Sequence, residues 1–285
     1  MKKPIIVAES GADIPTNLVN QYGIYIVPMH VNMGGQTYDD SLNIQATDVI
    51  QYYQTHKDLP TTSAATPLDY DNIFKNIRQS FPDQDIVVVS NSAQTTGSFN
   101  AARIASEEFD NIYLVDTENV SIGQGAIVIE AAKFIAGKDQ VTGSDVVAFV
   151  EELRQRVRFS FLPTTLEFLK AGGRVSNASY LVASFLHIFP SIDLKEGLLI
   201  AGKKYRGSFQ KSYRRMIDDF FIRFNLIPAS IVLVETAGLS QDDKDTITEI
   251  LKSKGVPEIH WHAAGAVITS HGGPGAFGIV GIESH

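Results

Sequence analysis

The sequence predicts an α/β fold in two parts, an N-terminal α/β domain over residues 1–160 and a C-terminal α+β domain over residues 161–285. Short apolar runs alternate with helical segments through the first 140 residues, which is typical of βαβ units around a mostly parallel sheet. In the second half a hairpin pattern lies among helices, which favours an α+β arrangement. No repeat or linker separates the parts, so we expect them to share an interface, where ligand sites are common.

The N-terminal elements follow from apolar runs and helix-start signals. The expected strands are Ile5–Ala8, Tyr25–Val31, Ile86–Val89 and Ile112–Val115. The expected helices are one starting near Pro15, followed by Ala46–His56, Pro67–Ser80, Ser98–Phe109 and Gly123–Ile135. Asp13 and Thr66 are the expected N-caps of the first and third of these helices, and residues 33–40 and 59–67 are expected to be loops.

The C-terminal elements mix hairpin and helical patterns. The expected helices are Ser144–Val157, a segment near 178–187, Ser208–Phe224 and Asp242–Lys254. The expected strands are an apolar run at 159–162, Ser230–Glu235, Glu258–His262 and Phe277–Ile282, with a hairpin formed by Ser191–Leu194 and Leu198–Ala201. The pair Gly172-Gly173 after Leu166–Lys170 fits a helix C-cap that is followed by a surface arginine, Arg174.

The composition excludes several classes of protein. The chain has no cysteine, which excludes disulfides, Cys-ligated zinc, iron–sulfur clusters and thiol catalysis. Its 24 Lys and Arg against 32 Asp and Glu give a net charge of −8, which argues against general binding to nucleic acid or anionic membranes. The apolar run after Met1 ends at Glu9, too early for a signal peptide, and no stretch approaches the ~20 apolar residues of a membrane span. We expect a cytoplasmic protein without an integral membrane segment.

Four loops rich in hydroxyl groups or glycine lie at the ends of expected strands, where ligands bind in open α/β sheets. They are Glu9–Asp13, Pro60–Pro67, Ser90–Ser98 and Ser270–Gly275. Each also has an ordinary interpretation as a helix lead-in or cap. In the second loop, capping explains Thr66 and Pro67 but leaves the hydroxyl groups of residues 61–63 unexplained.

The loop Ser90–Ser98 combines the hydroxyl groups of Ser92, Thr95 and Thr96 with the amides of a helix start at Gly97. Such a loop can hold an anion or a carboxylate. It lacks the lysine of a Walker A loop, so the sequence does not predict a nucleotide phosphate there. The alternative interpretation is a long capping loop.

His271 is the candidate for acid–base chemistry or ligand binding, because it lies among three glycines that allow close backbone approach. A structural histidine is the alternative. A Ser–His–Asp set drawn from His271, Asp116 and some serine has almost no specificity. The GxSxG, GxGxxG, HExxH and EF-hand patterns are absent. Asp39 and Asp40 are adjacent carboxylates, but the sequence shows no second pair for a metal ion.

A basic cluster follows the expected hairpin. It comprises Lys203, Lys204, Arg206, Lys211, Arg214 and Arg215, in a chain whose net charge is −8. Such a run is either a solvated helix face or a docking patch for an acidic partner or phosphate.

Several of these segments occur in an order that resembles the DegV family, the fatty-acid-binding subunits of bacterial fatty acid kinase systems. The resemblance covers essentially the whole chain, and its most specific segments are Leu166–Arg174, with Gly172-Gly173-Arg174, and His271–Gly278. The other matching segments are Glu9–Pro15, Thr61–Ser63 and Ser92–Ala102.

The resemblance implies two domains that enclose one long-chain fatty acid, with no cofactor. Its carboxylate would contact loop hydroxyl groups and its tail would lie in an apolar tunnel. The implied ligand-binding residues are Thr62, Ser63, Ser92, Thr95, Thr96, Gly97, His271 and Gly272. A separate ATP-binding kinase subunit would phosphorylate the bound acid, and Arg206 and Arg174 are the implied kinase-related residues. This chain would then be a non-catalytic carrier.

The chain departs from the family pattern in three loops. Glu9-Ser10-Gly11 stands for Asp-Ser-Thr, Thr62–Ala65 for Thr-Ser-Gln-Pro, and Ser92–Gly97 for Ser-Ser-x-Leu-Ser-Gly. Threonine at 96 keeps a hydroxyl group but adds a methyl group and stiffens χ1, so we expect a carboxylate site with altered packing. The run Tyr180–Phe189 is expected to be either a tunnel wall or a core helix.

Two other functions stay open on the residues themselves. One is a stand-alone phosphotransferase or hydrolase that uses His271 and a loop hydroxyl group. The other is a regulatory module that senses a different apolar ligand.

Overall fold

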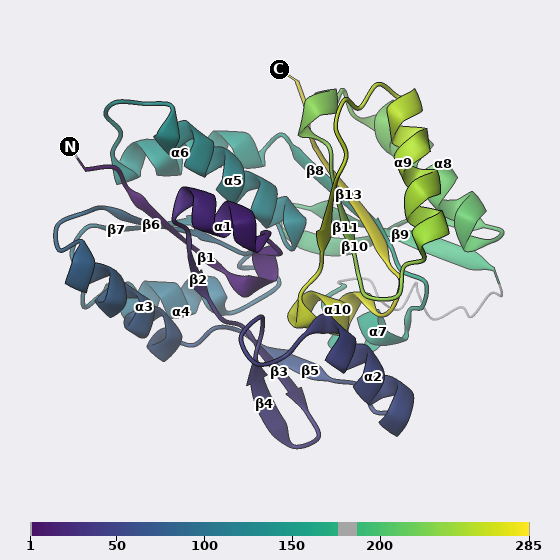
Figure 1. Ribbon diagram of the computed structural model, residues 1–285, viewed down its shortest axis with the longest axis horizontal. Coiled ribbons are helices and arrows are strands. Elements are labelled where there is room, and N and C mark those ends of the chain that lie inside the picture. The colour runs from purple at the N-terminus through teal and green to yellow at the C-terminus, as the bar shows by residue number, and fades with distance from the viewer. Residues whose placement is uncertain (1, 176–186, 285) are drawn as a thin grey trace.

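The computed structural model describes residues 2–175 and 187–284, and the strands of this part form three sheets (Figure 1). The N-terminal sheet has the order β2 (Tyr25–Val27), β1 (Ile5–Glu9), β6 (Ile86–Ser90) and β7 (Ile112–Asp116). All of its strand pairs are parallel. Strands β1 and β6 are buried along their whole length, as expected for parallel strands with helices on both faces. The predicted parallel sheet is confirmed.

Helices cover both faces of this sheet (Figure 1). One face carries α3 (Pro67–Ser80) and α4 (Ser98–Ser106), and the other carries α1 (Thr16–Tyr22), α5 (Ile122–Ala136) and α6 (Gly143–Arg154). The start of α3 is as predicted, because Thr66 accepts a hydrogen bond from the Asp69 amide while Pro67 occupies the first turn.

The C-terminal sheet is mixed. Its order is β10 (Leu198–Arg206), β9 (Ile188–Lys195), β8 (Val157–Leu162), β13 (Phe277–Ile282), β11 (Val232–Glu235) and β12 (His260–Ala263). Its pairs are antiparallel except β11 with β12. The predicted hairpin is confirmed as β9–β10. Its two turn residues, Glu196 and Gly197, have φ of 51° and 78°, as a tight hairpin turn requires.

The two large sheets share one apolar layer. Helix α5 contacts β1 and β6 on one side and β8, β11 and β13 on the other (Figure 1). Most of its residues are buried, and only a short stripe that contains Glu130 and Lys133 reaches the surface. The far face of the C-terminal sheet is covered by α8 (Phe209–Arg223) and α9 (Gln241–Ser253). The layers therefore run helix, sheet, helix, sheet, helix.

A third, small sheet corrects three predictions. Its order is β4 (Gln36–Asp39), β3 (His30–Met33) and β5 (Thr61–Ser63). The predicted strand Tyr25–Val31 is wrong in its extent, because Pro28 cannot donate to a ladder and the chain leaves the first sheet there. The predicted loops 33–40 and 59–67 contain β4 and β5. Both strands are short and largely polar, and so lack the apolar alternation by which strands are found.

Two short helices flank this small sheet. Helix α2 (Ala46–His56) has its predicted bounds. Helix α10 (Ala266–Gly272) lies where the sequence predicted a loop over Ser270–Gly275, because a helix of two turns leaves little periodic signal. His271 is therefore in the last turn of a helix rather than in a glycine bend.

Asp13 is not the N-cap of α1. It follows the 3₁₀ turn η1 (Ser10–Ala12) in the left-handed region with φ of 52°, and Pro15 occupies the cap position instead. The Asp13 carboxyl group is directed to the C-terminal half of the chain. By contrast, the predicted C-cap at Gly173 is confirmed, since it ends α7 (Glu167–Gly172) with φ of 63°.

The predicted helix near 178–187 and most of the apolar run Tyr180–Phe189 lie outside the described residues. The end of that run, Ile188 and Phe189, belongs to β9, and Phe189 packs against Phe209. Across 2–175 and 187–284, no helix has both the length and the apolar character needed to cross a membrane.

Candidate functional site

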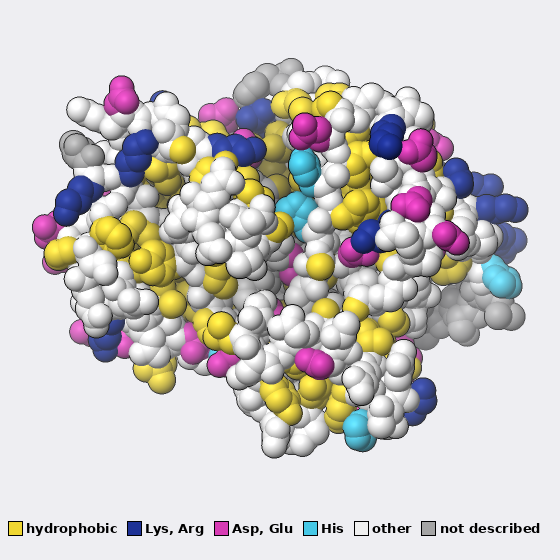
Figure 2. Space-filling view, in the orientation of Figure 1, with side chains coloured by type: hydrophobic (Ala, Val, Ile, Leu, Met, Phe, Trp, Pro, Cys, Tyr) yellow, Lys and Arg dark blue, Asp and Glu magenta, His cyan; other side chains and the backbone are white. Residues whose placement is uncertain are grey.

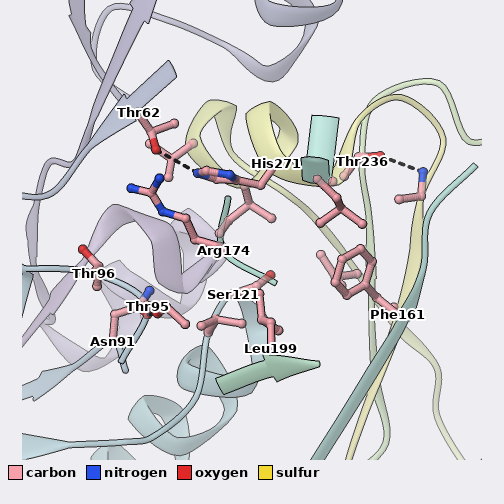
Figure 3. Close-up of a pocket in the computed structure, with 18 of the residues that line it drawn as sticks. Thr62, Asn91, Thr95, Thr96, Ser121, Phe161, Arg174, Leu199, Thr236 and His271 are labelled. Atoms are coloured by element: carbon pink, nitrogen blue, oxygen red, sulfur yellow. Dashed lines mark hydrogen bonds between the residues drawn. The ribbon is translucent and has the colours of Figure 1, made fainter. Parts of the chain in front are cut away.

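A pocket that is partly open to solvent lies between the two large sheets (Figure 3). One wall is hydrocarbon from β8, β10, β11 and β13. Its apolar side chains are Phe159, Phe161, Leu199, Val234 and Phe277. The opposite wall comes from β5, the loop after β6 and α10, which bring hydroxyl groups and a histidine. The pocket is thus apolar along most of its lining and polar at one corner.

Thr62 and His271 meet at the polar corner. Thr62 Oγ1 lies 2.8 Å from His271 Nε2, although the two residues are 209 positions apart (Figure 3). Strand β5 pairs with β3, with Thr62 opposite Val31, and this places Thr62 beside the last turn of α10. The structure therefore brings together a hydroxyl group and an imidazole that the sequence singled out separately.

Gly172 explains how the imidazole fits against α7. A Cβ on Gly172 would lie only 2.2 Å from His271 Nδ1, so only glycine allows α7 and α10 to approach this closely. Nδ1 is buried and has no hydrogen-bond partner among the described residues. Because an unpaired buried N–H is rarer than an unpaired acceptor, this favours the tautomer with the proton on Nε2. Nε2–H then donates to Thr62, and the Thr62 hydroxyl proton is free to point into the pocket.

His271 is neutral at physiological pH. Burial, together with the nearby positive charge of Arg174, lowers its pKa to about 4. Arg174 follows the Gly173 turn, and its Nη1 donates to the Gly172 carbonyl oxygen at 2.7 Å. In Figure 3 its guanidinium group points to the same corner as Thr62 and His271. The corner thus offers one fixed positive charge and two neutral polar groups, a set that suits a carboxylate.

The loop after β6 contributes Asn91, Thr95 and Thr96 to the pocket. Thr95 Oγ1 donates to the Ser92 carbonyl oxygen at 3.0 Å, and Thr96 Oγ1 lies 3.2 Å from Ser98 Oγ. Ser63 and Gly272 also line the pocket. Together with Thr62 and His271, six of the eight residues implied as ligand-binding therefore line the pocket.

Three residues named from the sequence lie outside the pocket lining. Ser92 Oγ donates to the Gly197 carbonyl oxygen at 2.7 Å, so it ties the β6 loop to the β9–β10 turn. Gly97 is the N-cap of α4, and a Cβ there would meet Ala64 at 3.8 Å. Arg206 is exposed at the end of β10, and its carbonyl oxygen accepts a hydrogen bond from Arg215.

The basic cluster around Arg206 is not free of acids. In Figure 2, Lys and Arg side chains gather at the right-hand edge, over the end of β10 and α8. Lys203 pairs with Asp219 at 2.6 Å, and Asp218 lies in the same shallow groove. Asp218 and Asp219 are on α8, so the packing of α8 against β10 brings acids to the basic cluster.

Sequence reasoning missed several residues of the lining. Ser121 and Met29 each contribute a side chain, and Thr236 holds the loop after α10 by donating to the Gly273 carbonyl oxygen at 2.6 Å. Ser121 has φ of 51°, a strained value for serine, and its hydroxyl group donates to Asp13 at 2.5 Å. Met29, Ser121 and Thr236 do not lie in a recognisable sequence motif, so only the fold shows that they belong to the lining.

A buried carboxylate supports the loop that carries Asn91. Glu9 accepts hydrogen bonds from Tyr70 and Ser90 at 2.5 Å, from Gln124 at 2.6 Å and from the Asn91 amide at 3.1 Å. These four donors satisfy both side-chain oxygens of Glu9. Glu9 of β1 is therefore linked by hydrogen bonds to residues of β6, α3 and α5.

Two more carboxyl groups hold the start of α10. Asp13 accepts from the Gly265 amide and Asp40 from the Ala266 amide, both at 2.8 Å. Both groups come from the N-terminal half, and α10 carries His271 at its other end. Burial raises the pKa of Asp40 and raises that of Asp13 to about 8. Asp39, the neighbour of Asp40, instead faces His30 at 2.9 Å.

The polar corner pairs a hydroxyl group with an imidazole. A hydroxyl group beside an imidazole is the pair that nucleophilic catalysis uses, but the base then needs a pKa near the working pH and an orienting partner. His271 has a pKa of about 4 and a buried Nδ1 with no partner among the described residues. Within that part of the chain, no three His, Asp or Glu side chains are arranged to hold a metal ion.

Known proteins match this chain over nearly its full length. Residues 3–284 match the family model described as an uncharacterised protein, DegV family. A DegV domain-containing protein of Caldanaerobacter subterraneus subsp. tengcongensis is 28% identical, with 98% of each chain covered. Protein DegV of Bacillus subtilis is 25% identical, covering 96% of this chain and 97% of its own.

Solved structures agree with the fold. The structure described as fatty acid binding of a DegV family protein from Thermus thermophilus superposes with a TM-score of 0.87, at 27% identity, covering 99% of this chain and all of that one. The Bacillus subtilis DegV structure has a TM-score of 0.82 at 24% identity and covers both chains completely. The chain therefore belongs to the DegV family.

Proposed function

We propose that this protein binds a long-chain fatty acid without transforming it. The observation that carries the proposal is the corner formed by Thr62, His271 and Arg174, at one end of a pocket lined by aliphatic and aromatic side chains. The carboxylate would accept from the Thr62 hydroxyl group and face the Arg174 guanidinium. The tail would lie against the hydrocarbon wall. The fatty-acid-binding relative from Thermus thermophilus, at 27% identity, supports this assignment.

The tail supplies most of the affinity in this proposal. Burying roughly 15 methylene groups at ~0.8 kcal/mol each gives about 12 kcal/mol before the loss of ligand freedom, which takes back several kcal/mol. A neutral hydrogen bond adds only about 1 kcal/mol net. Thr62, Thr95, Thr96 and His271 therefore orient the acid more than they hold it. Ser63 and Gly272 shape the same corner.

The rival function is a stand-alone phosphotransferase or hydrolase that uses His271 and the Thr62 hydroxyl group. The low pKa of His271, about 4, argues against it, because such a base is a poor proton acceptor at neutral pH. Turnover by the purified chain alone, lost in a His271→Ala variant, would favour the rival.

Native mass spectrometry of the purified protein, followed by extraction of what it carries, tests the proposal directly. One long-chain fatty acid per chain is the expected result, and its structure would report the preference of the pocket. A protein that stays empty when offered such acids would overturn the assignment. A bound apolar molecule without a carboxylate would point instead to a regulatory sensor.

Replacing Thr62 by alanine is expected to weaken fatty-acid binding by about fivefold, since one hydrogen bond contributes about 1 kcal/mol and 1.4 kcal/mol is tenfold. Isothermal titration with a single acid checks this. Thr62→Ser keeps the hydroxyl group and should bind nearly as well as the wild type. Equal affinity of the alanine and serine variants, both with normal melting temperatures, would remove Thr62 from the carboxylate site.

We further propose that the bound acid is presented to a separate ATP-binding kinase subunit, which transfers a phosphoryl group from ATP to the carboxylate. Arg206 supports this, because it is exposed, lies in a basic cluster and takes no part in the pocket lining. Arg174 stands at the carboxylate corner, where a partner would have to reach.

The Arg206→Ala variant is expected to bind fatty acid normally and to lower acyl-phosphate formation with the cognate kinase by at least about tenfold, the effect of losing about 1.4 kcal/mol of docking energy. The rate of acyl-phosphate formation at a limiting concentration of the carrier measures this. Arg103→Ala is the matched control, because Arg103 is an exposed arginine on α4 that pairs only locally, with Glu107. Equal turnover by both variants would exclude Arg206 from docking.

A further inference from the structure

Gly11 lies directly behind the pocket wall. It belongs to the 3₁₀ turn Ser10–Ala12 and is buried. A Cβ at this position would lie 2.8 Å from Met29 Sδ, 3.6 Å from Asn91 Nδ2 and 4.0 Å from Ile268 Cδ1. All three of these side chains line the pocket. The space that a side chain at position 11 would need is therefore occupied by these three pocket-lining side chains.

The backbone at Gly11 does not itself require glycine. Its φ is not in the positive range, in contrast to Gly23 and Gly173, where φ is 63°. Glycine is needed at this position because a side chain would not fit, and the nearest atom that it would meet is Met29 Sδ.

The Met29 backbone is held in place, so a larger residue at position 11 would move the Met29 side chain rather than its backbone. Its amide donates to Ser10 Oγ at 3.0 Å, and its carbonyl oxygen accepts from the Asp40 amide at 2.8 Å, so its backbone is held on both sides. The residue is only 5% exposed. A methyl group at position 11 would therefore displace the thioether, and the pocket that Met29 lines offers space for it.

The affected stretch of wall lies near the carboxylate corner. Ile268 precedes His271 by one turn of α10, a rise of about 4.5 Å along the helix axis. The first carbons of an acid held at Thr62 and His271 would pass this point. We infer that Gly11 is a specificity-determining residue, which keeps Met29 back and so allows acids that carry a substituent close to the carboxylate. This inference rests on the proposed fatty-acid binding.

The test compares hexadecanoic acid with 3-methylhexadecanoic acid. In Gly11→Ala the ratio of their dissociation constants should rise at least ~tenfold against the branched acid, the usual effect of one misfit methyl group. The double variant Gly11→Ala, Met29→Ala should return the ratio to near the wild-type value. Gly137→Ala is the control, because Gly137 ends α5 with φ of −78° and a Cβ there would touch only Lys133.

An unchanged ratio in Gly11→Ala would overturn the inference, and so would a raised ratio that Met29→Ala does not relieve. A second readout needs no fatty acid. Among the four methionines, the Met29 methyl resonance, assigned through Met29→Ala, should move in Gly11→Ala while the others hold. If the wild type binds neither acid, the proposed function fails, and the Met29 resonance alone decides whether Gly11 holds the wall in place.

Discussion

Replacing Glu9 by alanine should destabilise the protein by on the order of 5 kcal/mol. The change removes the acceptor of four buried donors, and each buried donor left unpaired costs about 1–3 kcal/mol. It also leaves a cavity between β1 and α5. Since Glu9 is fully buried, water has no access to replace the lost acceptor. We expect the loop that carries Asn91 to loosen, because its amide loses its partner.

Urea unfolding measures the loss, and Glu9→Gln provides the comparison. Glutamine keeps the shape and one carboxamide oxygen, and the hydroxyl groups of Tyr70 and Ser90 can rotate to accept from its amide. The glutamine variant should therefore lose less than half as much stability as the alanine variant. Alanine and glutamine variants of equal stability would mean that the hydrogen bonds to Glu9 contribute little beyond packing.

Replacing Asp13 by asparagine is expected to stabilise the protein above neutral pH by several kcal/mol. Burial raises the pKa of Asp13 from 3.8 to about 8, so the folded protein favours the protonated acid. A carboxyl group with a raised pKa stabilises the fold fully only below its unfolded pKa. As the pH rises from about 4 to about 8, each pH unit lowers the free energy of unfolding by about 1.4 kcal/mol. Asparagine resembles the protonated acid and avoids this cost.

The geometry at Asp13 accepts an amide. The side-chain oxygen of asparagine can accept from the Gly265 amide, and its NH₂ group can donate to Ser121 Oγ. The other titratable groups that face Asp13 are Asp40, whose repulsion adds to the raised pKa, and His262, whose pKa is lowered by burial. The asparagine side chain carries no charge, so it would not repel Asp40 or attract a proton to His262.

Urea unfolding at about pH 5 and about pH 8.5 checks the expectation, and the advantage of Asp13→Asn should grow between them. Asp145→Asn is a control with the opposite sign. The Asp145 carboxyl group is exposed, and its pKa is lowered by hydrogen bonds from Thr142 at the start of α6, although its slight desolvation acts the other way. Replacing Asp145 by asparagine should therefore not stabilise the protein at either pH. An advantage of Asp13→Asn that does not change with pH would contradict the protonated state.

Local signals predicted most of the large elements because their causes are local. Ala46–His56, Pro67–Ser80 and Phe277–Ile282 have their predicted bounds. A capping box and a proline in the first turn mark the start of α3, and a continuous apolar run marks β13. Where such signals are weak, prediction fails. Strand β5 is three polar residues, and α10 is two turns that end in glycine.

The sequence by itself determined the fold class, the family resemblance and the loops from which the polar corner is drawn. The tertiary structure decided which side chains share that corner. Thr62 and His271 meet across 209 residues, whereas Ser92 turns away to hold Gly197. The tertiary structure also decided the roles of Glu9 and Asp13, which hold the Asn91 loop and the start of α10 by hydrogen bonds. The physical reason is that helices and strands follow from periodicity and capping along the chain, while hydrogen-bond partners and buried charges depend on distances that only packing sets.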